Sequence, residues 1–79
     1  MLQKQKYTSP KYHAMWYKLY DCIGIRRKSG GKNQAFSFGK GSNQGEKRLR
    51  AWADDVLKEL DNGRTEQNTK KWIDERLAQ

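Results

Sequence analysis

The sequence has little of what disulfide-stapled domains, metal sites and membrane spans require. It contains one cysteine, Cys22, which excludes an internal disulfide and favours a reducing compartment. Together with the one histidine, His13, it makes too small a set of ligands for a zinc site. The longest apolar run, AMWY, has four residues, whereas a membrane-spanning helix needs about 20. Since the amino terminus also has no apolar stretch typical of a secretion signal, we expect a cytoplasmic or nucleoid-associated protein without a cofactor.

Acidic residues are scarce in the first part of the chain. Residues 1–50 contain twelve Lys and Arg against two Asp and Glu, a net charge of +10, whereas residues 51–79 contain five against seven, a net charge of −2. A positive field over one part of a small domain attracts a polyanion, and nucleic acid is the commonest polyanion in a cell. The same excess also occurs in small proteins whose lysines serve only solubility.

The composition predicts one small folded domain. The chain has 79 residues, and its three Trp, four Tyr and two Phe distinguish it from chains that stay disordered. We expect residues 1–12, which are polar and contain the single proline, to form a flexible basic arm. Residues 13–79 should form one α+β domain, in which a small antiparallel sheet of two to three strands packs on an amphipathic helix and a second helix follows at the carboxyl end.

The segment HAMWYKLY predicts a first strand. Side chains alternate between the two faces of a strand, so Trp16, Lys18 and Tyr20 share one face while Tyr17 and Leu19 share the other. We expect the face with Trp16 and Tyr20 to be the outer one, where these rings are able to stack on bases or to cover an edge or a dimer contact.

The segment CIGIRRKSGGKNQAFSFGK predicts a β-hairpin. Its central Gly-Gly pair, at residues 30–31, suits a two-residue turn because glycine tolerates positive φ. The register then places Ile25 opposite Phe36 and Ile23 opposite Phe38, all on one apolar face. A slip of one residue would mispair all four side chains.

The second face of this hairpin is basic. Two-stranded ribbons fit the major groove of DNA, where Arg and Asn read base edges, so we expect base contacts from Arg26 and Asn33. A solvated sheet face without a binding role is the alternative. By alternation this face carries Gly24, Arg26, Lys28, Asn33, Ala35 and Ser37, while Arg27 and Gln34 lie at the hairpin tip on the apolar face. The residues expected to bind nucleic acid are Trp16, Lys18, Arg26, Arg27, Lys28, Lys32, Asn33, Ser37 and Lys40, with Lys4, Lys6 and Lys11 of the arm as further phosphate contacts.

Two helices are predicted in the rest of the chain. Apolar residues recur at helical spacing in EKRLRAWADDVLKELDNG, and Gly63 suits the carboxyl-terminal cap. This helix should cover the apolar face of the hairpin. A second helix should begin after Thr65, a good amino-terminal cap, and pack on the core edge or on a partner. The apolar residues are Leu49, Trp52, Ala53, Val56, Leu57 and Leu60 in the first helix and Trp72, Ile73 and Leu77 in the second.

No convincing catalytic set is present. A nucleophile pair of Cys22 and His13 lacks a third group to orient the base, and a lone strand cysteine is usually a small core residue. The Gly-rich segment GKGSNQGEK precedes a helix but lacks the Gly-Lys-Ser/Thr ending of a nucleotide-binding P-loop. It is either a phosphate-contacting turn around Lys40 or a plain connector. We expect no enzyme.

The run GIRRKSGGK, the following AFSF and the helical RAWA together resemble small DNA-binding domains with a three-stranded sheet and a helix. This group includes the plant APETALA-type domain and the arm-binding domain of phage tyrosine integrases, and the resemblance covers residues 22–60. It implies that the helix braces the sheet, that the sheet enters the major groove, and that Arg26, Lys28, Asn33 and Ser37 face the groove. In those families a third strand precedes the helix, where this chain has GKGSNQ.

The sequence therefore predicts a non-enzymatic protein that binds double-stranded DNA through a basic β-hairpin face, such as a phage or mobile-element regulator or a recombination factor. Two other classes stay open. One is an RNA-binding module whose exposed aromatics stack on unpaired bases. The other is a small protein-interaction module, such as a phage inhibitor or adaptor, that uses the helix around Trp72. The oligomeric state is not predicted.

Overall fold

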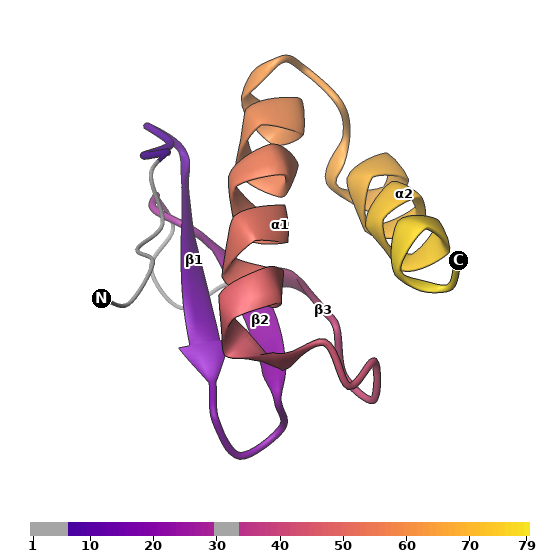
Figure 1. Ribbon diagram of the computed structural model, residues 1–79. Helices are drawn as coiled ribbons and strands as arrows, with labels where there is room; N and C mark the ends of the chain where they lie inside the picture. The colour runs from indigo at the N-terminus through magenta and orange to yellow at the C-terminus, as the bar shows by residue number, and fades with distance from the viewer. Residues whose placement is uncertain (1–6, 30–33) are drawn as a thin grey trace.

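The chain forms a three-stranded antiparallel sheet with two helices on one of its faces. The structure is a computed structural model and describes residues 7–29 and 34–79. The strands are β1 (Tyr12–Tyr17), β2 (Cys22–Arg27) and β3 (Gln34–Phe38), in the order β1-β2-β3, and the helices are α1 (Gly45–Asp61) and α2 (Glu66–Leu77). In Figure 1, α1 crosses β1 and β2 while α2 lies beside β3. The predicted α+β class is confirmed. The segment HAMWYKLY supplies β1, which completes the three-stranded sheet.

The first strand ends three residues earlier than predicted, and its faces are exchanged. Lys18–Asp21 form a turn in which the Tyr20 amide donates to the Tyr17 carbonyl at 3.2 Å. Trp16 lies opposite Ile23 and packs against the core, so its predicted outer position is wrong. The exchange has a physical reason: the indole buries more apolar surface than Tyr17, whose hydroxyl group keeps its access to polar partners on the outer face.

The register of the second hairpin is as predicted. Ile23 pairs with Phe38 and Ile25 with Phe36, whereas the proposed Gly-Gly turn lies outside the described residues. A β-bulge then shifts the register, so that Arg26 lies opposite Gln34 rather than Ala35. Ala35 consequently packs on the core, and Gln34 moves to the outer face; both predicted positions are wrong.

The core lies between the sheet and the two helices. The apolar stripe of α1 faces the sheet as predicted, with Trp52 half-buried at its margin, and Gly63 has a φ of 101° just after the helix. The fully or nearly fully buried core residues are Ile23, Ile25, Phe38, Leu49, Ala53, Val56, Leu57, Leu60 and Ile73.

The second helix belongs to this core. Thr65 caps it by accepting a hydrogen bond from the Asn68 amide at 3.1 Å, as predicted. Ile73 is completely buried, and Thr69 is buried with its hydroxyl donating to the Thr65 carbonyl at 2.7 Å. Removing this helix would therefore open the core, so a truncation of residues 64–79 does not separate a partner-binding role from folding.

The segment before β1 is docked on α1. Ser9 is 1 % exposed, and its hydroxyl donates to Asp61 at 2.8 Å. Tyr7 donates to the same carboxylate through its hydroxyl and to Asp54 through its amide at 3.2 Å. Residues 7–11 are thus part of the folded domain rather than a free arm, and residues 1–6 lie outside the described residues. Among the described residues, neither helix is long and apolar enough to cross a membrane.

Candidate nucleic-acid interface

Charge is segregated between the two layers of the fold. Eight of the nine acidic residues of the chain lie on α1 and α2, and the ninth, Asp21, lies in the β1–β2 turn. None of the described strand residues is acidic. On the helices the acids are largely matched by nearby cations, as in the pairs Glu46–Arg50 at 2.7 Å and Lys70–Asp74 at 2.8 Å. The excess positive charge of the described residues therefore lies on the strands and in the segments that flank and connect them.

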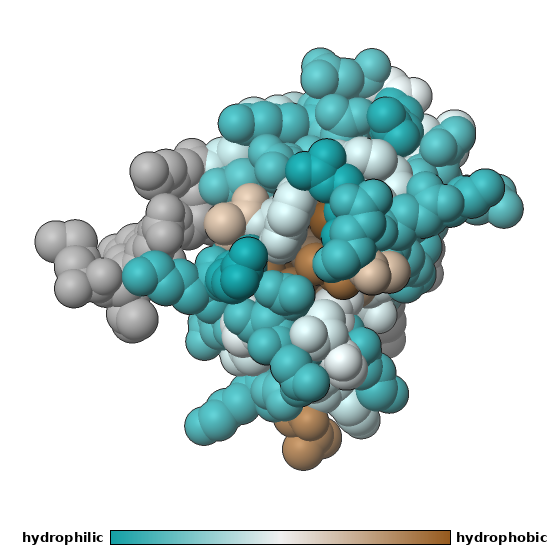
Figure 2. Space-filling model, turned by 45° about the vertical axis from the view of Figure 1, so that its right-hand side comes forward, coloured by the Kyte–Doolittle hydropathy of each residue, from teal (hydrophilic) through white to brown (hydrophobic). Residues whose placement is uncertain are grey.

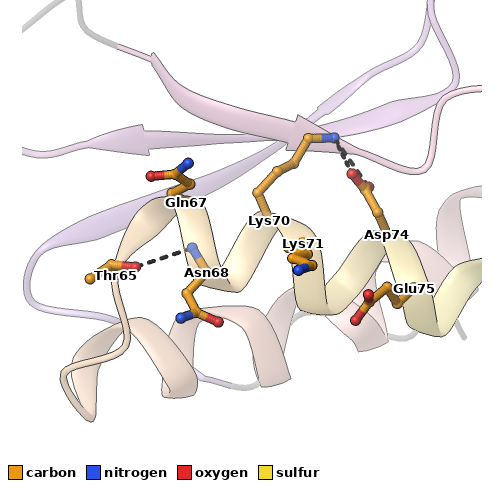
Figure 3. A pocket seen from close by; sticks show the side chains of 7 residues that line it. All are labelled: Thr65, Gln67, Asn68, Lys70, Lys71, Asp74 and Glu75. Carbon is orange, nitrogen blue, oxygen red and sulfur yellow. Dashed lines mark hydrogen bonds and ion pairs between the residues drawn. The ribbon is translucent and has the colours of Figure 1, made fainter.

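The helical side is a mixed polar surface. Seen from the side of α2, it is mostly hydrophilic with small hydrophobic patches (Figure 2). A hollow of about 600 Å³ lies along α2, and Figure 3 shows its wall. Lys70 and Asp74 are paired there, and Lys71 lies near Glu75 on the same helix. Its two lysines are balanced by two carboxylates, so the hollow has no net positive charge to attract a polyanion.

None of the described helices covers the outer sheet face, because both pack on the other face. Cross-strand pairing puts His13 opposite Arg26 and Met15 opposite Gly24 on it. Met15 is 42 % exposed, and Lys28 directly after β2 is exposed. The face thus carries cations at one end and apolar groups at its centre. Cationic side chains contact DNA phosphates, and apolar side chains contact the thymine methyl group in the major groove.

Tyr17 lies flat across this face. A Cβ atom added to Gly24 would lie 3.0 Å from Tyr17 Cδ2 and Cζ and closer still to Cε2, so the ring occupies the space above Gly24. The Tyr17 hydroxyl then reaches the third strand, where it donates to Gln34 Oε1 at 3.5 Å. Glycine leaves room for this placement of the ring, which any side chain at position 24 would displace. One aromatic side chain thus spans all three strands.

Beside this ring is a shallow hollow of about 340 Å³. Tyr17, Tyr20 and Cys22 supply aromatic and sulfur surface, while Gln34 and Ser37 supply an amide and a hydroxyl. The sixth lining residue is Lys40, whose Nζ lies 5.4 Å from the centre of the Tyr20 ring. None of the six residues that line it is acidic.

The predicted binding residues fall into four groups. Ser37 and Lys40 line the outer hollow, and Arg26 lies on the outer face. Lys18 and Lys28 are exposed beside that face, in the β1–β2 turn and after β2. Trp16 and Arg27 lie on the inner face, and Lys32 and Asn33 lie outside the described residues.

Arg27 has a structural partner. Its Nε and Nη2 atoms donate to both Glu66 oxygens, at 2.8 and 2.5 Å, and the Tyr12 hydroxyl donates to the same carboxylate at 2.9 Å. The hydrogen bond from Arg27 has the largest effect on the pKa of Glu66 and, together with that from Tyr12, holds it below its usual value, although partial burial opposes the shift. Burial and the bond to Glu66 raise the pKa of Tyr12. The cluster joins β1, β2 and α2, which indicates a stabilising role for Arg27.

The Gly-rich loop after β3 is organised by its own hydrogen bonds. The Ser42 hydroxyl donates to the Gly39 carbonyl at 2.6 Å, and the Ser42 amide donates to the same carbonyl at 3.0 Å. Gly39 and Gly41 adopt positive φ values of 92° and 77°. The loop brings Lys40 back toward Tyr20 at the edge of the outer hollow.

The geometry separates the two residues considered as a nucleophile pair. His13 pairs with Arg26 and Cys22 with Tyr17, so four strand positions, about 13 Å, lie between them. That distance excludes a hydrogen bond between the thiol and the imidazole. Within residues 7–29 and 34–79, no group of three or more His, Cys, Asp or Glu side chains is placed to hold a metal ion.

The sequence pointed to the basic hairpin face but missed Tyr17 and Gln34. Alternation placed both on the apolar side, and only the bulge and the β1–β2 register bring them outward. Gly24 was the sequence signal for the position of Tyr17, because a glycine within a strand often marks a close approach by another group.

Comparisons of the chain with protein-family models, with curated proteins and with solved structures find no significant match.

Proposed function

We propose that this protein binds double-stranded DNA through the outer face of its sheet and has no catalytic activity of its own. The observation that carries the proposal is the segregation of charge: the acids lie on the helices, while the uncovered sheet face carries cations around an apolar centre. Strands of β-ribbons and small β-sheets enter the DNA grooves in other DNA-binding proteins. The resemblance of residues 22–60 to sheet-plus-helix DNA-binding domains agrees with this orientation.

The division of roles follows from position. Lys28 and Lys40 take part in none of the ion pairs among the described residues and lie at opposite ends of the face, which suits contacts to the two phosphate backbones. Arg26, nearer the centre, is the candidate for a base contact. A role as a phage or mobile-element regulator or a recombination factor is compatible with a small, basic, non-enzymatic DNA-binding protein.

The test is a fluorescence-anisotropy titration of a random-sequence DNA duplex at low and at physiological salt. We expect binding that weakens steeply with salt, because each phosphate contact contributes about −0.9 to the logarithmic salt slope. Absence of binding at low salt would refute the proposal. Structured RNA that displaces the duplex at equal concentration would assign the face to RNA instead.

Two matched double variants distinguish direct DNA contacts by the sheet face from attraction of DNA by the net charge of the domain. Lys28→Glu with Lys40→Glu reverses two charges at the sheet face, and Lys47→Glu with Lys71→Glu makes the same change in net charge on exposed helix positions. The first should lower affinity by about tenfold or more relative to the second. Equal losses would show that only the net charge of the domain matters.

A further inference from the structure

We propose that the outer hollow reads one A·T base pair, with Gln34 facing the adenine and the Tyr17 ring facing the thymine methyl group. This inference rests on the proposed function, since it assigns a sequence preference to the same face. It begins from an unusual combination: an amide side chain stands next to apolar surface in a hollow of about 340 Å³, with a lysine at the edge.

The amide is positioned by the fold. The β-bulge at Ala35 turns Gln34 to the outer face, where its Oε1 atom accepts a hydrogen bond from the Tyr17 hydroxyl at 3.5 Å. The Nε2 group has no hydrogen-bond partner among the described residues, and Oε1 keeps a second lone pair. A glutamine amide with a free donor and a free acceptor matches the N7 acceptor and N6 donor that adenine presents in the major groove.

The apolar part of the hollow is complementary to the other base of that pair. Thymine is the base with a methyl group in the major groove, and apolar side chains recognise it by contact. The Tyr17 ring, held flat above Gly24, offers such a surface. A G·C pair lacks this methyl group and places the acceptor O6 where the amide would need a donor.

Lys40 and Ser37 explain how the base pair would be held in register. The Lys40 ammonium lies over the Tyr20 ring at the edge of the hollow, where it is able to contact a backbone phosphate. Ser37 lies opposite Gly24 in the neighbouring strand, and its hydroxyl lines the hollow beside the Tyr17 ring. Phosphate contacts fix position, and the amide and ring then discriminate between bases.

The first experiment selects binding sites from a pool of random duplexes with the wild type, with Gln34→Ala and with Gln67→Ala. Gln67 is an exposed glutamine on α2 and serves as the matched control. We expect the wild type and the control to enrich A·T at one position that Gln34→Ala no longer selects, while all three bind random duplex within about twofold, because phosphate contacts dominate non-specific affinity. An unchanged A·T preference in Gln34→Ala, a G·C preference at this position, or no preference at any position would overturn the inference and leave duplex binding standing.

The second experiment modifies single atoms of the selected pair. Replacing adenine by 7-deaza-adenine removes the N7 acceptor and should weaken binding by about fivefold or more, and replacing thymine by uracil removes the methyl group and should weaken it by about two- to fivefold. Gln34→Ala should be insensitive to the 7-deaza change but should keep the response to uracil. Equal sensitivity of both proteins to the 7-deaza change would overturn the assignment of Gln34. Failure of the wild type to bind any duplex would overturn both this inference and the proposed function.

Discussion

The substitution Gly24→Ala tests the structure of the outer face at one atom. The new methyl group would overlap the Tyr17 ring, which is half-exposed and can swing into solvent. Alanine itself gains about 0.5–1 kcal/mol over glycine within a strand. Displacing the ring loses the weak hydrogen bond to Gln34 and part of the packing of the ring, together about 1–2 kcal/mol. The net destabilisation should therefore lie between about 0 and 1.5 kcal/mol.

The measurements are thermal unfolding and duplex titration. A loss of this size shifts the midpoint of a domain of this length by no more than about 12 °C, so the fold should survive. Affinity for the duplex that the wild type selects should nevertheless fall, because the ring no longer lines the hollow. In a Tyr17→Ala background the clash is absent, and Gly24→Ala should then stabilise the protein. Equal destabilisation in both backgrounds, or unchanged affinity of the single variant for the selected duplex, would refute this reasoning.

Three further predictions concern other parts of the domain. Arg26→Ala should erode discrimination between selected and random duplexes, whereas Lys28→Ala should weaken binding to both alike and reduce the salt slope by about one. Both variants are titrated with both duplexes. If each variant loses the same affinity for the selected and the random duplex, this division of roles is wrong. Leu57→Ala should destabilise the fold by about 2–5 kcal/mol, measured by urea unfolding, because Leu57 is 1 % exposed within the core; a loss below 1 kcal/mol would contradict the packing. Since Arg27 lowers the pKa of Glu66 in the folded state, the resulting stability is present above the ordinary value of 4.5 and is lost as pH falls through the lowered pKa. Glu66→Gln should accordingly lose stability at pH 7 and reduce the acid sensitivity of unfolding, and an unchanged pH profile would contradict this.

The sequence predicted the hairpin register because four large apolar residues must reach the same face. Any slip would have exposed Ile23, Ile25 and Phe38, which are almost fully buried. The helices were equally readable from their spacing and from Thr65 and Gly63 at their ends. These are local or nearly local signals.

The errors arose where the decisive contacts are distant in sequence. In YHAMWY both faces carry large residues, so alternation alone did not show which face Trp16 takes. The bulge at Ala35 likewise has no periodic signature. The docking of Ser9 depends on Asp61, on the far end of α1. Candidate site residues in the hairpin were therefore found, whereas the ring of Tyr17 and the amide of Gln34 required the assembled sheet.

The most direct test of the central claim is an NMR titration of ¹⁵N-labelled protein with a short DNA duplex. We predict that the largest amide shift changes fall on the outer sheet face and its edge, at Gly24, Arg26, Ser37 and Lys40, while α2 changes little. Largest changes on α2, or no changes at low salt, would contradict the assignment of the sheet as the DNA-binding surface.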